Sequence, residues 1–420
     1  MSFTENLTRA FKHKNYRHYF FWQFLSFAGT WMQSTAQSWL IYKLTGSALF
    51  MGFLNFAATL PALFLTPFAG VVADKFQRRK VLLTTQILCL VQGIILVTLY
   101  YSGTITKWHV LFLAILLGIA NSFDVTARQS FIPLLINKKD LLNAIALNSS
   151  MFNAARILGP AVAGILIASK GEGICFILNV FSYIPIIIFL LLVKAKKQEI
   201  KEFSSPMFHL KEGMSYAWNT MPIRSLLIMV GTASFWGMSF TTFMPIFADQ
   251  ILHSGSKGLG MLMCSSGVGA VIGGLFLASR QKIYNISNLI CLSLIVLSIS
   301  LFMFSLSTNI FLSMFLLCLT GFSFMIISAG SNTSMQSMAP DYLRGRVVSL
   351  YSMMFMGMFP LGSLIVGVIA NKVNVQFACQ IGATFSFIIG LYFLFRLPEL
   401  NRESNKIACD KEAAGYYPLE

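Results

Sequence analysis

Long apolar stretches alternate with short polar ones along most of the chain. Most apolar stretches contain about 20 residues or more, and a helix of that length, rising about 1.5 Å per residue, crosses the roughly 30 Å hydrocarbon core of a bilayer. Transmembrane β-strands are shorter, at about 10 residues. The pattern therefore predicts an all-α membrane protein that crosses the lipid bilayer many times.

We predict twelve membrane-spanning helices from these stretches. They cover residues 19–42, 48–73, 81–101, 108–128, 143–168, 173–193, 223–248, 258–279, 286–306, 309–331, 346–370 and 376–396. An even number of spans places both termini on the same side of the membrane.

The positions of the positive charges test this count, because Lys and Arg concentrate in cytosolic loops. Of the 31 Lys and Arg residues, 25 fall on the side that holds the termini, five fall on the other side, and Arg156 lies within a span. This alternation predicts cytosolic termini. The net charge of +16 therefore reflects topology and does not indicate a nucleic-acid partner, since the cations occupy short loops between spans.

The longest polar interruption divides the chain into two halves. The predicted organisation is an N-terminal six-helix bundle (1–193), a cytosolic linker (194–222), a C-terminal six-helix bundle (223–396) and a cytosolic tail (397–420) that resembles a disordered extension. The two halves resemble each other locally, since QSFIP at 129–133 aligns with QSMAP at 336–340. Such internal symmetry is typical of secondary transporters, whose substrate site lies between the halves.

One loop between two predicted spans is densely charged. Residues 70–81 read GVVADKFQRRKV, with four cations and one carboxylate. This stretch resembles the G-x-x-x-D-R-x-G-R-R signature that follows helix 2 in the major facilitator superfamily, with Lys75 and Gln77 at two of its positions. Further stretches resemble the branch of enterobactin exporters and macrolide-efflux permeases: SWLIYKLTGSALFMG (38–52), NSFDVTARQSFIPLLI (121–136), NAARILGPAVAGILI (153–167) and LRGRVVSLY (343–351).

The resemblance implies a major facilitator fold of two pseudo-symmetric bundles, in a bacterial inner membrane, and a cytosolic gate at the charged loop. The implied gating residues are Asp74, Arg78 and Arg79, and the internal repeat adds Asp341, Arg344 and Arg346. The alternative is that these charges only set the topology.

Charged residues within spans are costly and therefore informative. Asp124 and Arg128 stand four residues apart on one helix, so they share a face and can pair. A carboxylate whose proton affinity depends on its neighbour suits proton coupling, but a static latch explains the pair equally well. Asp249, at the outer end of the seventh span, is a second candidate for proton coupling, although we favour its interpretation as a solvated helix end.

Arg156 lies roughly 20 Å into the fifth span. It could bind an anionic group of a substrate, orient a proton relay, or hold its helix against a neighbour through backbone carbonyls. Amide and aromatic side chains on other spans could line a cavity with it, although each could instead form an interhelical hydrogen bond. The candidate substrate-binding residues are Arg156, Gln33, Gln37, Asn153, Asn179 and Trp236.

The sequence lacks the motifs of nucleotide-driven or catalytic proteins. It has no Walker loop, no HExxH and no GxSxG motif, and its seven cysteines show no metal-ligand spacing. We therefore predict no enzyme activity, no cofactor and no metal, and energy supplied by an ion gradient with protons as the coupling ion.

The sequence favours a secondary active transporter that exports a small organic molecule, either a siderophore or a drug, by alternating access. An uptake permease remains an alternative, because the fold does not fix the direction of transport. A non-transporting membrane receptor or scaffold on the same fold is a further alternative.

Overall fold

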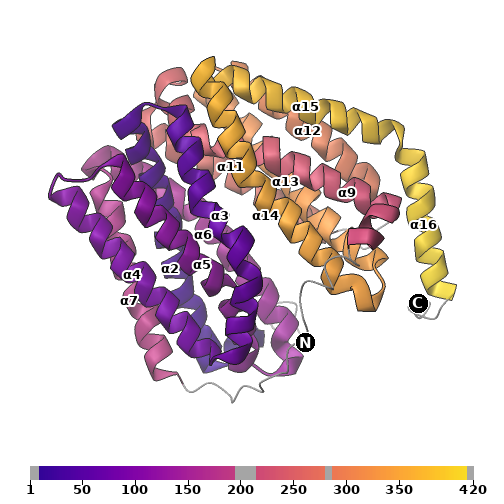
Figure 1. Cartoon of the computed structure of the whole chain (residues 1–420), viewed down its shortest axis with the longest axis horizontal. Helices are drawn as coiled ribbons and strands as arrows, with labels where there is room; N and C mark the ends of the chain where they lie inside the picture. The colour runs from indigo at the N-terminus through magenta and orange to yellow at the C-terminus, as the bar shows by residue number, and fades with distance from the viewer. Residues whose placement is uncertain (1–8, 194–213, 280–285, 414–420) are drawn as a thin grey trace. The chain divides into compact units, whose positions relative to one another are not determined.

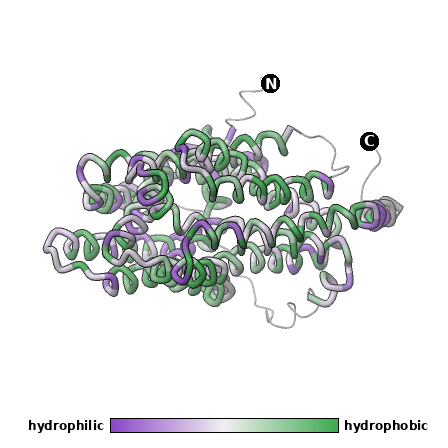
Figure 2. Tube along the Cα trace, turned by 90° about the horizontal axis from the view of Figure 1, so that it is seen from above, coloured by the Kyte–Doolittle hydropathy of each residue, from purple (hydrophilic) through white to green (hydrophobic). Residues whose placement is uncertain are grey.

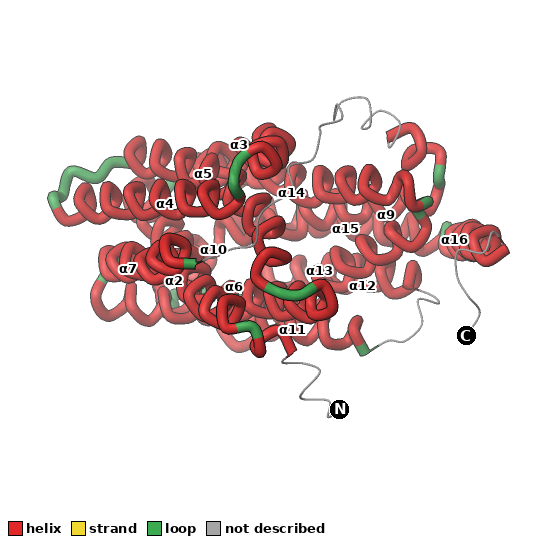
Figure 3. Tube along the Cα trace, turned by 90° about the horizontal axis from the view of Figure 1, so that it is seen from below, coloured by secondary structure: helices red, strands yellow, loops and turns green. Residues whose placement is uncertain are grey.

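The computed structural model describes residues 9–193, 214–279 and 286–413. Within these ranges the elements are helices joined by short loops, and no strand occurs (Figure 3). The chain forms two compact units (Figure 1). Unit 1 contains Met1–Ser204 and Met244–Cys264, and unit 2 contains Ser205–Phe243 and Ser265–Glu420.

Unit 1 is built from six long helices. They are α2 (Lys14–Thr45), α3 (Ala48–Lys75), α4 (Arg78–Tyr101), α5 (Lys107–Leu135), α6 (Leu141–Lys170) and α7 (Gly173–Leu192), with the short helices η1 (Arg9–Lys12) and η2 (Lys138–Asp140). α2 packs against α6 and α7, α4 packs against α5 and α7, and α3 packs against α5. Polar N-caps define the starts of α3 and α5, because the hydroxyls of Ser47 and Thr106 accept hydrogen bonds from backbone amides of the first turn.

The remaining elements belong mainly to unit 2. They are α9 (Met221–Thr232), η3 (Ala233–Met238), η4 (Ser239–Phe243), α10 (Met244–Ile246), η5 (Phe247–Ile251), α11 (Gly255–Ala278), α12 (Ile286–Leu306), α13 (Ile310–Met338), α14 (Asp341–Lys372), α15 (Val375–Phe395) and α16 (Leu397–Ala413). The segment from α10 to the first part of α11 packs within unit 1, although the predicted division assigns it to the C-terminal bundle.

The predicted seventh span, 223–248, is irregular along its length. It continues from α9 through a π-helical stretch (η3), a 3₁₀ stretch (η4), α10 and a second π-helical stretch (η5). The hydroxyls of Ser234 and Ser239 donate to the carbonyls of Phe355 and Phe359 on α14, at 2.5 and 3.1 Å. These contacts hold the irregular stretch against α14, and π-bulges of this kind are frequent at functional sites.

Eleven of the described helical stretches are long and apolar enough to cross a membrane. Apolar residues dominate them (Figure 2). α2 contains the first predicted span and, at 32 residues, is long enough to cross a membrane. It is not apolar enough to be counted among the eleven stretches. Its buried face carries Gln23, Gln33 and Gln37, which lower its hydropathy without facing lipid. The twelfth span and the cytosolic termini stay predictions.

The expectation of a disordered tail after residue 396 is wrong for residues 397–413, which form α16. Leu400 is buried in the core of unit 2, and Ile407 packs against the same core. Asn401 Nδ2 donates to Asn288 Oδ1 of α12 at 2.8 Å. The apolar residues recur at helical spacing, so this polar stretch can bury one face against unit 2. Residues 414–420 lie outside the described residues.

Candidate substrate and coupling site

Asp124 and Arg128 of α5 form an ion pair, which confirms the predicted pairing. The Asp124 side chain is 1% exposed. Its Oδ1 accepts hydrogen bonds from Thr85 Oγ1 at 2.9 Å and from Gln86 Nε2 at 2.8 Å, both on α4. The Arg128 guanidinium lies 4.1 Å from the centre of the Phe27 ring of α2. Three helices therefore converge on one buried charge pair.

A chain of polar side chains lies in the interior of unit 1, farther along α2. Asn179 of α7 donates to Gln33 Oε1 at 2.7 Å, and Gln33 Nε2 donates to Gln92 Oε1 of α4 at 3.2 Å. Asn179 also contacts the Tyr183 hydroxyl at 3.3 Å. Gln33 and Asn179 are fully buried. They were predicted to line a cavity, and in this structure they bond to each other inside the bundle; their role in substrate binding stays a prediction.

Gln37 lies one turn beyond Gln33 on α2 and is also buried. Its Nε2 has no hydrogen-bond partner among the residues that the structure describes. A buried amide without a partner costs about 1–3 kcal/mol, so Gln37 retains a donor that a ligand or water could use.

The apolar face of α6 is exposed around its middle. The exposed residues on this face are Leu158, Val162 and Ile165. On a membrane-spanning helix an exposed aliphatic stripe of this kind is the surface that meets lipid.

α6 has a second exposed face, and it is polar. Arg156 lies about 160° around the helix from Leu158, at 3.6 residues per turn. Arg156 and Asn153 are partly exposed, and Ser149 and Phe152 are exposed on the same side. Two predicted substrate-binding residues, Arg156 and Asn153, thus share one accessible face. Asn153 Nδ2 donates to the Ser149 carbonyl at 2.9 Å, whereas Arg156 has no hydrogen-bond or ion-pair partner among the described residues.

An aromatic cluster adjoins this polar face. The Phe152 ring meets the edges of two rings of α2, Phe27 at 5.2 Å and Trp31 at 5.9 Å between centroids. Phe27 and Phe152 are not among the substrate-binding residues predicted from the sequence. Their spacing could have identified them, because Phe152 precedes Arg156 by four residues and Phe27 precedes Trp31 by four, which places each pair on one helix face.

Trp236 belongs to unit 2 and is partly exposed on η3. Its ring stacks on Phe385 of α15, with 5.6 Å between centroids and 6° between planes, and Gly382 leaves room for it. The structure does not join Trp236 to the residues of unit 1, and its role in substrate binding stays a prediction.

The cations of the charged loop contact the ends of other helices in unit 1. Arg78 Nη1 donates to the Ser130 carbonyl of α5 at 3.0 Å, and Arg79 Nη1 donates to the Val193 carbonyl after α7 at 2.7 Å. The Val193 carbonyl follows the last turn of α7, where intrahelical donors are missing, and the Ser130 carbonyl lies near the C-terminal end of α5. The two arginines therefore brace helix ends in addition to any effect on topology.

Of the other four predicted gating residues, the structure describes the side chains of two. Arg344 and Arg346 lie in the first turns of α14, with Arg344 exposed and Arg346 partly exposed. The side chains of Asp74 and Asp341 lie outside the described side chains. The gate as a whole stays a prediction.

A second polar cluster lies at the other end of unit 1. Glu172, between α6 and α7, is nearly buried and pairs with Lys43 Nζ at 2.8 Å, while the Tyr100 hydroxyl donates to it at 2.8 Å. Burial raises the pKa of Glu172, but the hydrogen bonds from Lys43, its own backbone amide and Tyr100, together with the Lys43 charge, lower it below its ordinary value overall.

Asp249 differs from its interpretation as a solvated helix end. The Tyr42 hydroxyl of α2 donates to Asp249 Oδ2 at 2.6 Å, and the Asp249 side chain is partly buried. This hydrogen bond ties the Met244–Cys264 segment to α2 within unit 1.

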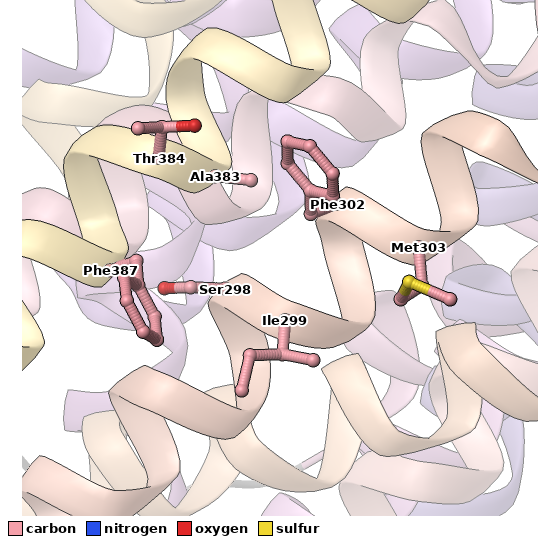
Figure 4. A pocket seen from close by; sticks show the side chains of 7 residues that line it. All are labelled: Ser298, Ile299, Phe302, Met303, Ala383, Thr384 and Phe387. Carbon is pink, nitrogen blue, oxygen red and sulfur yellow. The ribbon is translucent and has the colours of Figure 1, made fainter.

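A groove of about 240 Å³ lies between α12 and α15 in unit 2 (Figure 4). Ser298 and Ala383 form its floor, and its other lining residues are Ile299, Phe302, Met303, Thr384 and Phe387. It contains no charged side chain and none of the predicted site residues. In the part of the chain that the structure describes, no group of three His, Cys, Asp or Glu side chains could hold a metal ion.

A family model described as transmembrane secretion effector matches residues 8–413. The chain belongs to this family of major facilitator transporters. The resemblance to the siderophore- and drug-exporter branch is therefore confirmed, and the protein is a multi-pass membrane transporter and not an enzyme.

The transporter is similar over most of its length to characterised bacterial proteins. It is 27% identical to the staphyloferrin A transporter of Staphylococcus aureus, over 93% of this chain and 98% of the relative. It is 25% identical to the multidrug efflux pump Tap of Mycolicibacterium fortuitum, over 90% and 95% of the two chains. It is 23% identical to macrolide efflux protein A of Streptococcus pyogenes, over 83% and 87%.

Solved transporter structures share the fold. The nucleoside transporter NupG matches with a TM-score of 0.70 and 14% identity, over 91% of this chain and 99% of that chain. A bacterial homologue of the human lysosomal transporter Spinster, in an inward-facing and unoccupied conformation, matches with a TM-score of 0.69 and 12% identity, over 94% and 98%. At these identities the likeness concerns the fold alone.

Proposed function

We propose that the transporter exports a small organic molecule, a siderophore or a drug, in exchange for protons. The observation that carries this proposal is the polar face of α6, because partly exposed Arg156 and Asn153 on a membrane-spanning helix are better accommodated beside an aqueous path than beside lipid. The names of the relatives support both substrate classes, since one is a siderophore transporter and two are efflux proteins.

The proposed topology has twelve spans, with α2 as the span whose polar face is buried inside unit 1. Both termini are cytosolic, as the distribution of Lys and Arg favours. The two bundles alternate between inward and outward openings, and the charged loops form the cytosolic gate. Arg78 and Arg79 hold the ends of α5 and α7 in place, so that Asp74 can engage and release a partner without disturbing unit 1.

In the proposed coupling step, Asp124 exchanges a proton while Arg128 serves as its alternating partner. The deprotonated carboxylate is stabilised by Arg128, Thr85 and Gln86. Protonation removes the charge that binds Arg128, which then loses its counter-charge in a buried site. The pair would therefore separate when the proton binds, and the Arg128 side chain would be free to take another partner.

In the proposed substrate site, Arg156 and Asn153 contact the substrate directly. Gln33, Asn179 and Gln37 are the buried candidates of unit 1, and Gln37 Nε2 has no partner among the described residues. Trp236 is the candidate of unit 2.

Transport into inverted membrane vesicles tests this proposal. With the vesicle interior acid, a proton-coupled exporter accumulates a labelled siderophore or a labelled macrolide, and collapse of the gradient abolishes the accumulation. Asp124→Asn should lower gradient-driven accumulation by about tenfold or more. It should leave exchange between labelled and unlabelled substrate across the membrane intact, because exchange needs no proton step.

Three other results would contradict proton-coupled export. If Asp124→Asn abolishes exchange as well in a folded protein, the pair is a static latch. Accumulation only in right-side-out vesicles with acid outside identifies an uptake permease. If neither substrate moves in either vesicle, the receptor or scaffold alternative gains support.

A further inference from the structure

We infer that the polar face of α6 selects organic anions, with Arg156 binding a carboxylate group and the adjacent aromatic cluster binding the apolar body of the same molecule. This inference rests on the proposed transport function and specifies its substrate class. The polar face comprises Ser149, Phe152, Asn153 and Arg156, and the aromatic cluster comprises Phe27, Trp31 and Phe152.

The position of Arg156 excludes lipid as its surroundings. α6 spans Leu141–Lys170, so Arg156 lies about 22 Å from its start and close to its middle. An arginine at the centre of a bilayer costs about 2.5–3.5 kcal/mol on insertion scales. The lipid-facing stripe of Leu158, Val162 and Ile165 lies on the opposite side of the helix. The side that carries Arg156 is therefore turned away from lipid, and its partly exposed surface can border water or a ligand.

Arg128 of α5 and Arg156 of α6 differ in what neutralises them. Arg128 is paired with Asp124 and covered by the Phe27 ring. Arg156 is partly exposed and has no acidic or hydrogen-bond partner among the described residues. One full positive charge is consequently available on this face, and an anion supplies the missing partner.

The chemistry of these side chains restricts the chemical class of ligand that this face can bind. A guanidinium presents donors in a planar fork that matches both oxygens of a carboxylate. Phe152 stands one helical turn before Arg156 on α6, and the Phe27 and Trp31 rings of α2 that contact it extend this apolar surface. The same positive charge repels organic cations, so the face discriminates by sign of charge.

Binding of three probes with the same aromatic body to the purified full-length transporter tests the inference. The probes are 2-naphthoate, 2-naphthylmethanol and 2-naphthylmethylammonium, and dissociation constants are measured by equilibrium dialysis. The anion should bind at least about tenfold more tightly than the alcohol, and the cation more weakly than the alcohol.

Variants assign this preference to Arg156. Arg156→Gln should remove the difference between anion and alcohol, and Arg156→Lys should retain part of it, because a lysine keeps the charge without the fork. Phe152→Ala should weaken the binding of all three probes equally. Lys170→Gln, which removes a cation at the end of the same helix, is the matched control and should leave all three constants unchanged.

Equal binding of the anion and the cation to the unmodified protein would overturn the inference, and so would an unchanged preference in Arg156→Gln. Comparison of the three probes on the unmodified protein tests the anion preference even if Arg156→Gln does not fold. Failure of the proposed function gives a different result. In that case the anion preference and its loss in Arg156→Gln persist, while no substrate moves with the proton gradient in vesicles.

Discussion

At the scale of single residues, Arg128 shows how a charge can be held inside a membrane protein. It combines an ion pair with Asp124 and an aromatic face from Phe27, so its cost of burial is offset from two sides. The spacing of Asp124 and Arg128 made their pairing predictable. The contributions of Phe27, Thr85 and Gln86 were not, since they come from helices distant in the sequence.

Removal of one partner of this pair should destabilise the protein strongly. Arg128→Gln leaves the Asp124 carboxylate buried without a counter-charge, at a cost of about 3–5 kcal/mol. Thermal unfolding in detergent measures the loss. The double variant Asp124→Asn with Arg128→Gln should recover much of the stability, because no lone charge remains. Additive losses in the double variant would show that the two side chains do not interact.

Glu172 gives a prediction about pH. Its pKa is lowered in the folded protein by Lys43 and Tyr100, so the stability it contributes is present above the ordinary glutamate pKa of about 4.3 and is lost as the pH falls through the lowered value. The melting temperature of the native protein should therefore exceed that of Glu172→Gln at pH 7. The difference should shrink as the pH falls below about 4. A constant difference from pH 7 to pH 3 would contradict this.

At the scale of helices, one glycine in each half of the chain, Gly118 or Gly321, brings two neighbouring helices into backbone contact. A Cβ atom on Gly118 of α5 would collide with the Ala58 carbonyl of α3, and one on Gly321 of α13 would collide with the Ser266 carbonyl of α11. The same close approach at corresponding helices in both halves agrees with the internal repeat in the sequence.

Substitution of these glycines should separate the helices. Gly118→Ala and Gly321→Ala should each lower the free energy of unfolding by about 1–3 kcal/mol, because the obstructing atoms are backbone and cannot rotate away. Gly345→Ala in α14 is the matched control, since nothing lies within 4 Å of its added Cβ atom. Unchanged melting of Gly118→Ala would show that α3 and α5 pack less closely than in this structure.

At the scale of the whole molecule, the number of spans decides on which sides the termini lie. α2 is less apolar than the other eleven stretches, yet its buried Gln33 is hydrogen-bonded within unit 1 to Gln92 of α4 and Asn179 of α7. A helix can thus cross a bilayer with amides on one face, provided that neighbouring helices cover that face.

Reporters fused to either end test the twelve-span topology. A fluorescent protein should fold and fluoresce at both the N-terminus and the C-terminus, and alkaline phosphatase should be inactive at both, if the termini are cytosolic. An active phosphatase at one end only would mean that α2 does not cross the membrane and that eleven spans remain.

The sequence by itself determined the features that depend on local pattern. Length and apolarity predicted twelve spans, and eleven helical stretches of the structure are long and apolar enough to cross a membrane. The loop charges predicted an orientation, and a four-residue spacing identified the Asp124–Arg128 pair. These conclusions need only the period of a helix and the thickness of a bilayer. The motifs also identified the family, because they follow one another in order along most of the chain.

The tertiary structure alone decided which face of each helix is covered. It placed Gln33 and Asn179 in the interior of unit 1 and left Arg156 accessible, although all three are polar residues within helices. It also folded residues 397–413 into α16, against the expectation from their composition. The physical reason is the same in each case: whether a polar side chain is satisfied or a weakly apolar helix is stable depends on partners that are distant in sequence, and these partners are set only when the helices pack.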